Sequence, residues 1–84
     1  MQLMQIDVKT NFKIDFRRAL EIAKSIASNF GESMLLSWCD FKTGKKIPDV
    51  DCCGENSWEI YAIQRGGNLR VNVNDCSFIF RVEF

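Results

Sequence analysis

Residues 69–73 alternate apolar and polar side chains, and residues 78–84 carry an apolar side chain at every second position; these two runs constrain the fold of this chain more than any other feature. Successive side chains of an extended chain point to opposite sides, so alternation predicts strands with one buried face. Asn74-Asp75 separates the two runs, and short turns rich in Asn and Asp connect antiparallel strands. The sequence therefore predicts a hairpin near its C-terminal end.

A second hairpin is expected immediately before the first. Residues 58–65 carry apolar side chains on both sides of an extended chain, which indicates a strand with both faces covered. Gly66-Gly67-Asn68 follows, and a loop of Gly and Asn between two apolar runs is a strong hairpin signal. Residues 58–84 are thus expected to form three strands of an antiparallel meander.

The helix signal of the chain lies in residues 15–30. Apolar side chains recur there at three- and four-residue spacing, which places them on one face of a helix. Asp15 is suited to cap the first turn, because its carboxylate can accept a hydrogen bond from a free backbone N–H. We expect this helix to lie across one face of the sheet.

Two more strands are expected in the first half of the chain. Residues 33–41 read as a strand with both faces apolar, and residues 3–9 alternate weakly and would add a fifth strand. Residues 42–45 are expected to form a polar turn, and residues 47–57 an irregular connection that includes the one proline.

The expected fold is α+β: a two-layer sandwich with one amphipathic helix packed on an antiparallel meander sheet of four or five strands. Residues 1–84 are expected to form a single domain, because a chain of 84 residues is short for two. One helix leaves apolar side chains on the other face of the sheet, with Leu35, Tyr61 and Ile63 as candidates. Monomers rarely expose such a patch, so a homodimer formed through a face or an edge of the sheet is predicted.

The net charge of the chain indicates which classes of binding partner are unfavourable. Lys plus Arg and Asp plus Glu both number 11, so the formal net charge is zero. Nucleic acids and anionic membranes usually require a basic surplus, and neither is expected as a partner. The chain also lacks the 18 to 20 continuous apolar residues that a membrane span needs, and its N-terminus does not resemble a signal peptide. A soluble protein of the cytoplasm is expected.

The four cysteines have the spacing C-x12-C-C-x22-C, and the chain contains no histidine. Structural zinc sites normally place two ligands two to four residues apart, so neither a metal nor another cofactor is expected. Reduced, buried cysteines are the favoured interpretation. The alternative is a reactive pair, Cys52-Cys53, although the acidic residues around it would raise the thiol pKa and lower the thiolate fraction.

No catalytic residue is assigned from the sequence, since histidine and the G-x-S-x-G pattern are both absent. Arg65 precedes two glycines and could bind a carboxylate or phosphate together with exposed backbone amides, while turn formation alone explains Asn68. Trp58 reads as a core or interface aromatic. The candidate binding residues are Cys52, Cys53, Trp58, Arg65 and Asn68.

Residues 36–76 resemble a small family of uncharacterised proteins from archaea and anaerobic bacteria, known as a domain of unknown function. The likeness is carried by Cys52, Cys53, Gly54, Trp58, Tyr61, Arg65, Gly66, Gly67, Asn68 and Asp75. It implies a compact α+β fold and no assigned activity, so no functional residue can be transferred from it.

These observations favour a non-enzymatic interaction or ligand-binding module that forms a homodimer. The alternative is a thiol-based redox or sulfur-handling protein that uses Cys52-Cys53. A third hypothesis is an accessory subunit that docks on a protein partner through a sheet edge or the polar face of the helix.

Overall fold

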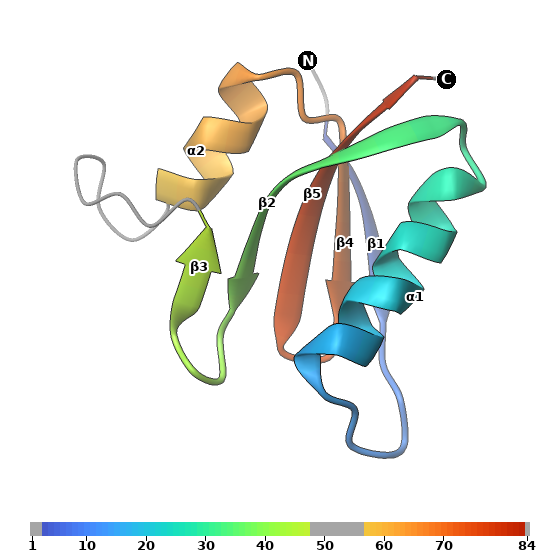
Figure 1. Ribbon diagram of the computed structural model, residues 1–84, viewed down its shortest axis with the longest axis vertical. Helices are drawn as coiled ribbons and strands as arrows, with labels where there is room; N and C mark the ends of the chain where they lie inside the picture. Colours follow the sequence, from blue (N-terminus) through green and yellow to red (C-terminus); the bar gives the residue numbers. More distant parts are fainter. Residues whose placement is uncertain (1–2, 48–56, 84) are drawn as a thin grey trace.

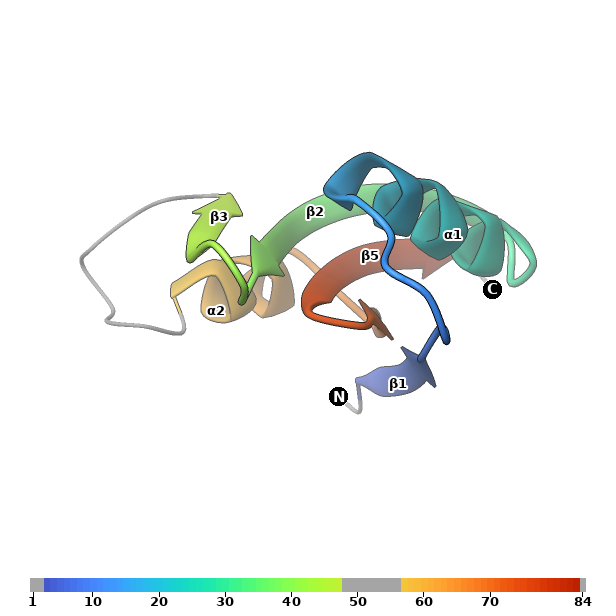
Figure 2. The same ribbon diagram turned by 90° about the horizontal axis from the view of Figure 1, so that it is seen from below.

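The computed structural model of the protein describes residues 3–47 and 57–83. Its elements, shown in Figure 1, are β1 (Met4–Val8), α1 (Phe16–Ser28), β2 (Glu32–Asp40), β3 (Lys45–Ile47), α2 (Ser57–Gln64), β4 (Leu69–Val73) and β5 (Cys76–Glu83). Within the described residues, the five strands form one sheet in the order β1-β4-β5-β2-β3. Seen along the sheet, α1 and α2 lie on opposite sides of it (Figure 2).

The α+β class is confirmed, but the expected antiparallel meander is wrong in part. β1 pairs with β4 in parallel, whereas the other neighbouring strands are antiparallel. β4 and β5 take the middle of the sheet, because their inward side chains, such as Val71 and Phe78, are fully buried. The more polar β1 is left at the edge.

The strand predicted at residues 58–65 is instead the helix α2. The apolar side chains of this segment fit either period, and eight residues are too few for periodicity to decide between them. In the helix, Trp58 and Ala62 lie one turn apart on the same face, and both are buried. That burial selects the helix, so two helices replace the single expected one.

Gly66-Gly67 ends α2 and does not form the predicted hairpin. The Gly66 N–H donates to the Ile63 carbonyl at 3.1 Å, and the Gly67 N–H donates to the Ala62 carbonyl at 2.8 Å, which together form a Schellman motif. Gly66 has φ +89°, a conformation that a Cβ disfavours. A Cβ on Gly67 would lie 2.9 Å from both the Ala62 carbonyl oxygen and a methyl group of Ile79. Both glycines are therefore required where the helix end meets β5.

Other local predictions can be compared directly with the structure. Asp15 caps α1, and its carboxylate accepts a 2.8 Å hydrogen bond from the Arg18 N–H. Asn74-Asp75 connects β4 to β5 as expected, with Asn74 at φ 52°. The predicted turn at residues 42–45 overlaps the short strand β3, which begins at Lys45; a strand of three residues carries too little periodic signal to be predicted.

The main core lies between α1 and the sheet. Ala19, Ala23 and Ala27 form the buried stripe of α1, and their small side chains let the helix approach the sheet closely. The sheet supplies the larger members of this core: Leu69, Val71, Val73, Cys76, Phe78, Phe80 and Val82. Large side chains from the strands and small ones from the helix thus fill the space between the two layers.

The opposite side of the sheet carries a second, smaller cluster, in which Trp58 and Ala62 of α2 pack against Cys39 and Ile79. The expectation that this face would be left bare and apolar is wrong, because α2 covers part of it. Leu35, named as a candidate for that face, instead packs against the α1-side core. An uncovered apolar second face therefore gives no support to a homodimer, which remains a prediction.

Candidate functional site

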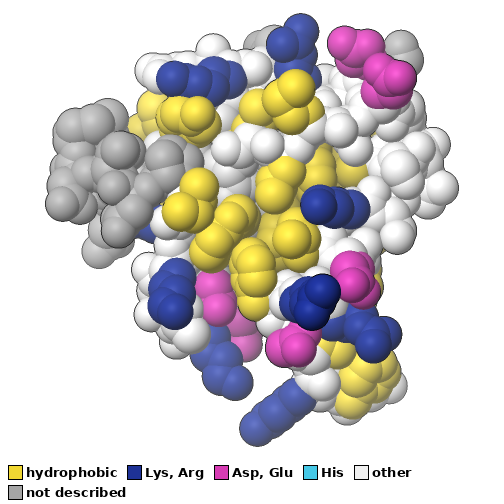
Figure 3. Space-filling view, in the orientation of Figure 1, with side chains coloured by type: hydrophobic (Ala, Val, Ile, Leu, Met, Phe, Trp, Pro, Cys, Tyr) yellow, Lys and Arg dark blue, Asp and Glu magenta, His cyan; other side chains and the backbone are white. Residues whose placement is uncertain are grey.

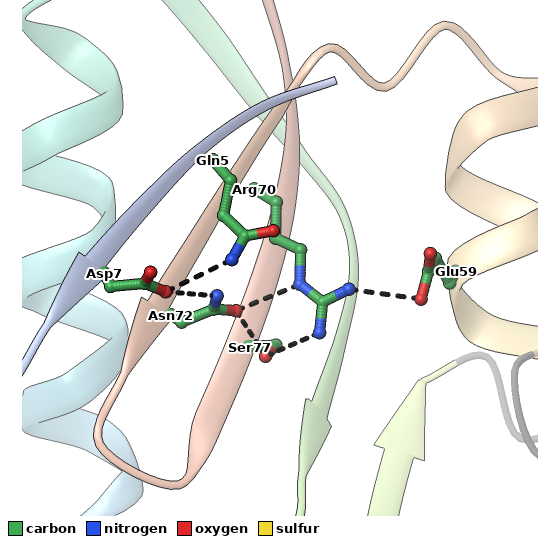
Figure 4. Close-up of polar contacts among 6 residues, drawn as sticks. All are labelled: Gln5, Asp7, Glu59, Arg70, Asn72 and Ser77. Atoms are coloured by element: carbon green, nitrogen blue, oxygen red, sulfur yellow. Dashed lines mark hydrogen bonds and ion pairs between the residues drawn. The ribbon is translucent and has the colours of Figure 1, made fainter. Parts of the chain in front are cut away.

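A network of polar side chains lies on the α2 side of the sheet, next to the small apolar cluster (Figure 4). It joins Gln5 and Asp7 of β1, Arg70 and Asn72 of β4, Ser77 of β5 and Glu59 of α2. β4 and β5 place their members side by side, because Asn72 lies directly opposite Ser77 in the register. Asp7 lies beside Asn72 in the parallel pair.

Arg70 is the centre of this polar network. Its Nε donates to the Asn72 side-chain oxygen at 3.0 Å, one terminal nitrogen donates to Glu59 at 3.1 Å, and the other donates to Ser77 Oγ at 3.3 Å. The guanidinium carbon also lies 5.2 Å from the centre of the Trp58 ring. Bonds at all three nitrogens fix the plane of the guanidinium, so the group is preorganised.

The Arg70–Glu59 ion pair is partly shielded from water, with side-chain exposures of 18% and 31%. It ties α2 to the middle of the sheet. The other ion pair in the described residues, Arg18–Glu21 on the surface of α1, spans 3.9 Å and is 69% and 65% exposed. Shielding and the additional hydrogen bonds make the Arg70 pair the stronger of the two.

Asp7 accepts a 2.6 Å hydrogen bond from the Asn72 side-chain amide and a 3.4 Å bond from Gln5. The bond from Asn72 is the largest cause that holds the pKa of the Asp7 carboxyl below its usual value, since it stabilises the charged form. Asp7 therefore carries a full negative charge near neutral pH.

α2 packs on β2 and β5, so the part of this face formed by β1 and β4 extends beyond the helix. Gln5 and Asp7 are exposed there, and Arg70 and Asn72 are half-buried. We call these four residues the open polar face. It presents two amides, a carboxylate and a fixed guanidinium on a rigid sheet, which suits the recognition of hydrogen-bonding groups.

The sequence pattern alone does not reveal this network. In that pattern Arg70 and Asn72 are only the polar positions of an alternating strand. The predicted turn at Asn74-Asp75 does imply that Asn72 and Ser77 lie opposite each other, so that pair could have been found. Asp7 and Glu59 could not, because β1 joins the sheet beside β4 and Glu59 belongs to a helix that was read as a strand.

The structure places three of the five predicted binding residues. Trp58 is 2% exposed and belongs to the α2-side cluster. The Asn68 side chain bonds the backbone N–H and carbonyl of Val82 at 2.9 and 2.8 Å, so it extends the β4–β5 pairing by one position. Arg65 is exposed at the end of α2, with its guanidinium carbon 3.7 Å from the centre of the Tyr61 ring. Cys52 and Cys53 lie outside the described residues.

Cys39 and Cys76, the free cysteines among the described residues, are both buried. They cannot act together on one metal or disulfide, because Cys39 belongs to the α2-side cluster and Cys76 to the α1-side core. Burial raises the pKa of both thiols, and that of Cys76 to about 11, with nearby Asp40 adding to the increase. Both are thus protonated and weakly nucleophilic near neutral pH.

A cleft of about 510 Å³ lies at the N-terminal end of α1, between the β1–α1 loop and the turns after β2 and β4. Two of the three carboxylates that line it stabilise local structure: Asp15 caps α1, and Asp40 accepts bonds from the Lys42 N–H and the Thr43 hydroxyl. No cluster of three or more metal-binding side chains occurs within residues 3–47 and 57–83. Neither described helix is long and apolar enough to cross a membrane.

Taken together, the mixed five-stranded sheet with a helix on each side defines a small α+β protein with a polar network on one face. The chain belongs to the family described as domain of unknown function DUF5619, whose model matches residues 1–82. An uncharacterized protein from Archaeoglobus fulgidus is 45% identical over 84 residues, covering 99% of this chain and 92% of the relative. The resemblance to an uncharacterised family with archaeal members is thereby confirmed.

The fold is shared with a solved structure. The crystal structure of the protein AF1514 from Archaeoglobus fulgidus matches with a TM-score of 0.93 and 44% sequence identity, covering 98% of this chain and 96% of that one. The mixed sheet and the two helices are therefore a property of a known protein structure as well as of this chain.

Proposed function

We propose that this protein is a non-enzymatic interaction module of the cytoplasm that acts as a homodimer and binds a polar protein segment on its open polar face. The observation that carries the binding proposal is the Arg70 guanidinium, which is held at three nitrogens between Glu59 of α2 and the part of the sheet that extends beyond this helix. A fixed hydrogen-bonding surface loses little conformational entropy when a partner binds.

The charges on and beside this face indicate the partner. Glu59 already neutralises Arg70, and Asp7 and nearby Lys9 add one charge of each sign, so the group carries two positive and two negative charges. A polyanion such as nucleic acid finds no positive surplus there. Amide and ammonium groups are complementary to the Asp7 carboxylate and to the amides of Gln5 and Asn72.

The test is a titration of the isotope-labelled protein followed by amide NMR signals. The probes are a short blocked peptide of glycine and asparagine with a central lysine, and the same peptide with glutamate in place of the lysine. We expect the lysine peptide to shift the signals of Gln5, Asp7, Arg70 and Asn72 at lower concentration than the glutamate peptide, and Asp7→Asn to remove this preference. Shifts confined to another surface, or equal responses to both peptides, would contradict the proposal.

A thiol function of Cys52-Cys53 remains the second proposal. It can be tested by reaction rate, because the other two cysteines, Cys39 and Cys76, are buried. Cys39 and Cys76 are buried and protonated, so they should react slowly with a thiol reagent in the native protein. Fast modification of two thiols, assigned to Cys52 and Cys53 by peptide mass spectrometry, would support the thiol function. Four thiols that react only in denaturant would exclude it.

A further inference from the structure

β1 forms one edge of the sheet, and its backbone directions can be assigned residue by residue. The Met4 N–H donates to the Asn68 carbonyl at 3.0 Å, and the Val8 carbonyl accepts from the Asn74 N–H at 2.9 Å. In a parallel pair, alternate residues turn their backbone groups toward the neighbouring strand, so Met4, Ile6 and Val8 face β4. Gln5 and Asp7 therefore direct their N–H and carbonyl groups outward, where no described strand lies.

The two edges of the sheet differ in protection. β3, at the far edge, has three residues, two of which are lysines, and short charged edges discourage strand pairing. β1 has five residues in regular extended conformation, without proline, glycine or a bulge. α1 packs on β2, β4 and β5, and Met4 on β1 is 37% exposed. β1 is thus the edge that is open to another strand.

We propose that β1 pairs antiparallel with β1 of a second copy, about a two-fold axis beside Ile6, so that the two sheets become one continuous sheet. This inference rests on the homodimer of the proposed function and specifies its interface. The two-fold axis makes the contact self-complementary, as a closed dimer requires. Edge-strand pairing is an established mode of protein association.

The register follows from which residues face outward. Leu3, Gln5, Asp7 and Lys9 occupy the outward positions by alternation, and outward residues must pair with each other to form hydrogen bonds. With the two-fold axis beside Ile6, all four outward residues have a partner: Gln5 lies opposite Asp7 of the second copy, and Leu3 lies opposite Lys9. An axis at Asp7 would place two like charges face to face, which is unfavourable. An axis at Gln5 would leave Lys9 without a partner among the described residues.

The side-chain contacts that an axis beside Ile6 would create are favourable on both faces of the sheet. Met4 meets Val8 and Ile6 meets Ile6 on the α1 side, so the partly exposed apolar side chains of both copies come together. On the other side, the Gln5 amide of each copy can donate to the Asp7 carboxylate of the other. The two open polar faces then adjoin across the axis, and each copy contributes an amide next to the network of its partner.

The experiment measures the dissociation constant by sedimentation equilibrium up to millimolar concentration, because a strand-edge interface is small and the dimer is expected to be weak. In the proposed register, Gln5→Glu sets two acidic pairs across the axis and Gln5→Lys sets two opposite-charge pairs. We expect the first to weaken and the second to strengthen the dimer, each by roughly 2- to 30-fold. Far-UV circular dichroism confirms that each variant is folded.

The signs of the two effects separate the registers. An axis at Gln5 would make both variants weaken the dimer, and an axis at Asp7 would reverse the two effects, because Gln5 would then face Lys9. Either of these two patterns would overturn the proposed interface but not the proposal of a homodimer. The same holds if the wild-type protein dimerises and neither Gln5 variant changes its dissociation constant. A mass of 9.7 kDa at every concentration overturns both.

A rival interface provides the matched control. Hydrophobic side chains gather on the α1 side of the molecule, between the two helices (Figure 3). Half-buried Trp38 of β2 lies on this side, directly opposite Ile47 of β3, which is 51% exposed. We expect Ile47→Lys to leave the dimer unchanged. If Ile47→Lys dissociates the dimer and the Gln5 variants leave its dissociation constant unchanged, the interface lies on this apolar surface and the inference is overturned.

Discussion

The two faces of the sheet are built from alternate residues of the same strands, yet they differ in chemistry. On the α1 side, β4 and β5 contribute only apolar side chains to a closed core. On the α2 side, the intervening residues include Arg70, Asn72 and Ser77, which bond to one another beside a small apolar cluster. The larger apolar core makes the α1 side the main source of stability, while the α2 side combines a smaller apolar cluster with a partly exposed polar network.

The largest expected effect comes from the α1 side. Phe78→Ala removes a fully buried ring that lies 5.6 Å from the ring of Phe16, and should lower the free energy of unfolding by about 3–5 kcal/mol. Urea denaturation measures this. Phe12→Ala is the matched control, because Phe12 is 69% exposed and its loss should change little. Equal effects of the two changes would show that the α1-side core does not dominate stability.

The next largest effect is expected where α2 meets β5. Gly67→Ala forces a methyl group against the Ala62 carbonyl and Ile79, and should cost about 1–3 kcal/mol in urea denaturation. Ser25→Ala on the exposed side of α1 serves as the control, with an expected change within about 0.5 kcal/mol. A Gly67→Ala protein as stable as the wild type would mean that α2 can shift without loss.

The polar network should show a smaller but measurable coupling. A double-mutant cycle with Arg70→Gln and Glu59→Gln is expected to give about 1 kcal/mol, because the pair is partly shielded and shares hydrogen bonds with Asn72 and Ser77. The same cycle on Arg18 and Glu21 should give less than about 0.5 kcal/mol. If the two couplings are equal, the α2-side network has no special role in holding α2.

The smallest effect concerns the titration of Asp7. Its pKa is lower in the folded than in the unfolded protein, so its contribution to stability is present above the unfolded pKa and is lost as the pH falls through the folded pKa. Asn72→Ala removes the largest cause of the lowering and should raise the pKa of Asp7 toward its usual value. NMR titration of the Asp7 carboxyl carbon measures this, and an unchanged midpoint would show that Asn72 does not stabilise the charge.

Local patterns predicted the parts of the fold that depend on neighbouring residues. The helix of residues 15–30, its cap at Asp15 and the Asn74-Asp75 hairpin follow from spacing and turn chemistry, and the structure contains all three. α2 was misread because an apolar segment of eight residues satisfies both helical and strand periods. Gly66-Gly67 was misread for a related reason, since glycines suit a hairpin and a helix end equally well.

The candidate site was less predictable than the fold. β1 is distant in sequence from the other three elements of the site, and Asp7 and Asn72 are 65 positions apart. Only the Asn72–Ser77 pair follows from a local turn. The parallel pairing of β1 with β4 brings Asp7 to Asn72, and the position of α2 brings Glu59 to Arg70, and neither arrangement leaves a periodic signal in the chain.

The sequence by itself determined which residues alternate, where α1 begins and where the last hairpin turns, because short-range sterics and side-chain direction control these features. Tertiary structure alone decided the strand order, the helical state of α2 and the assembly of the polar network. The physical reason is that these depend on burying Trp58 and Ala62 against Ile79 and on pairing strands far apart in the chain. Such contacts form only when distant segments pack together.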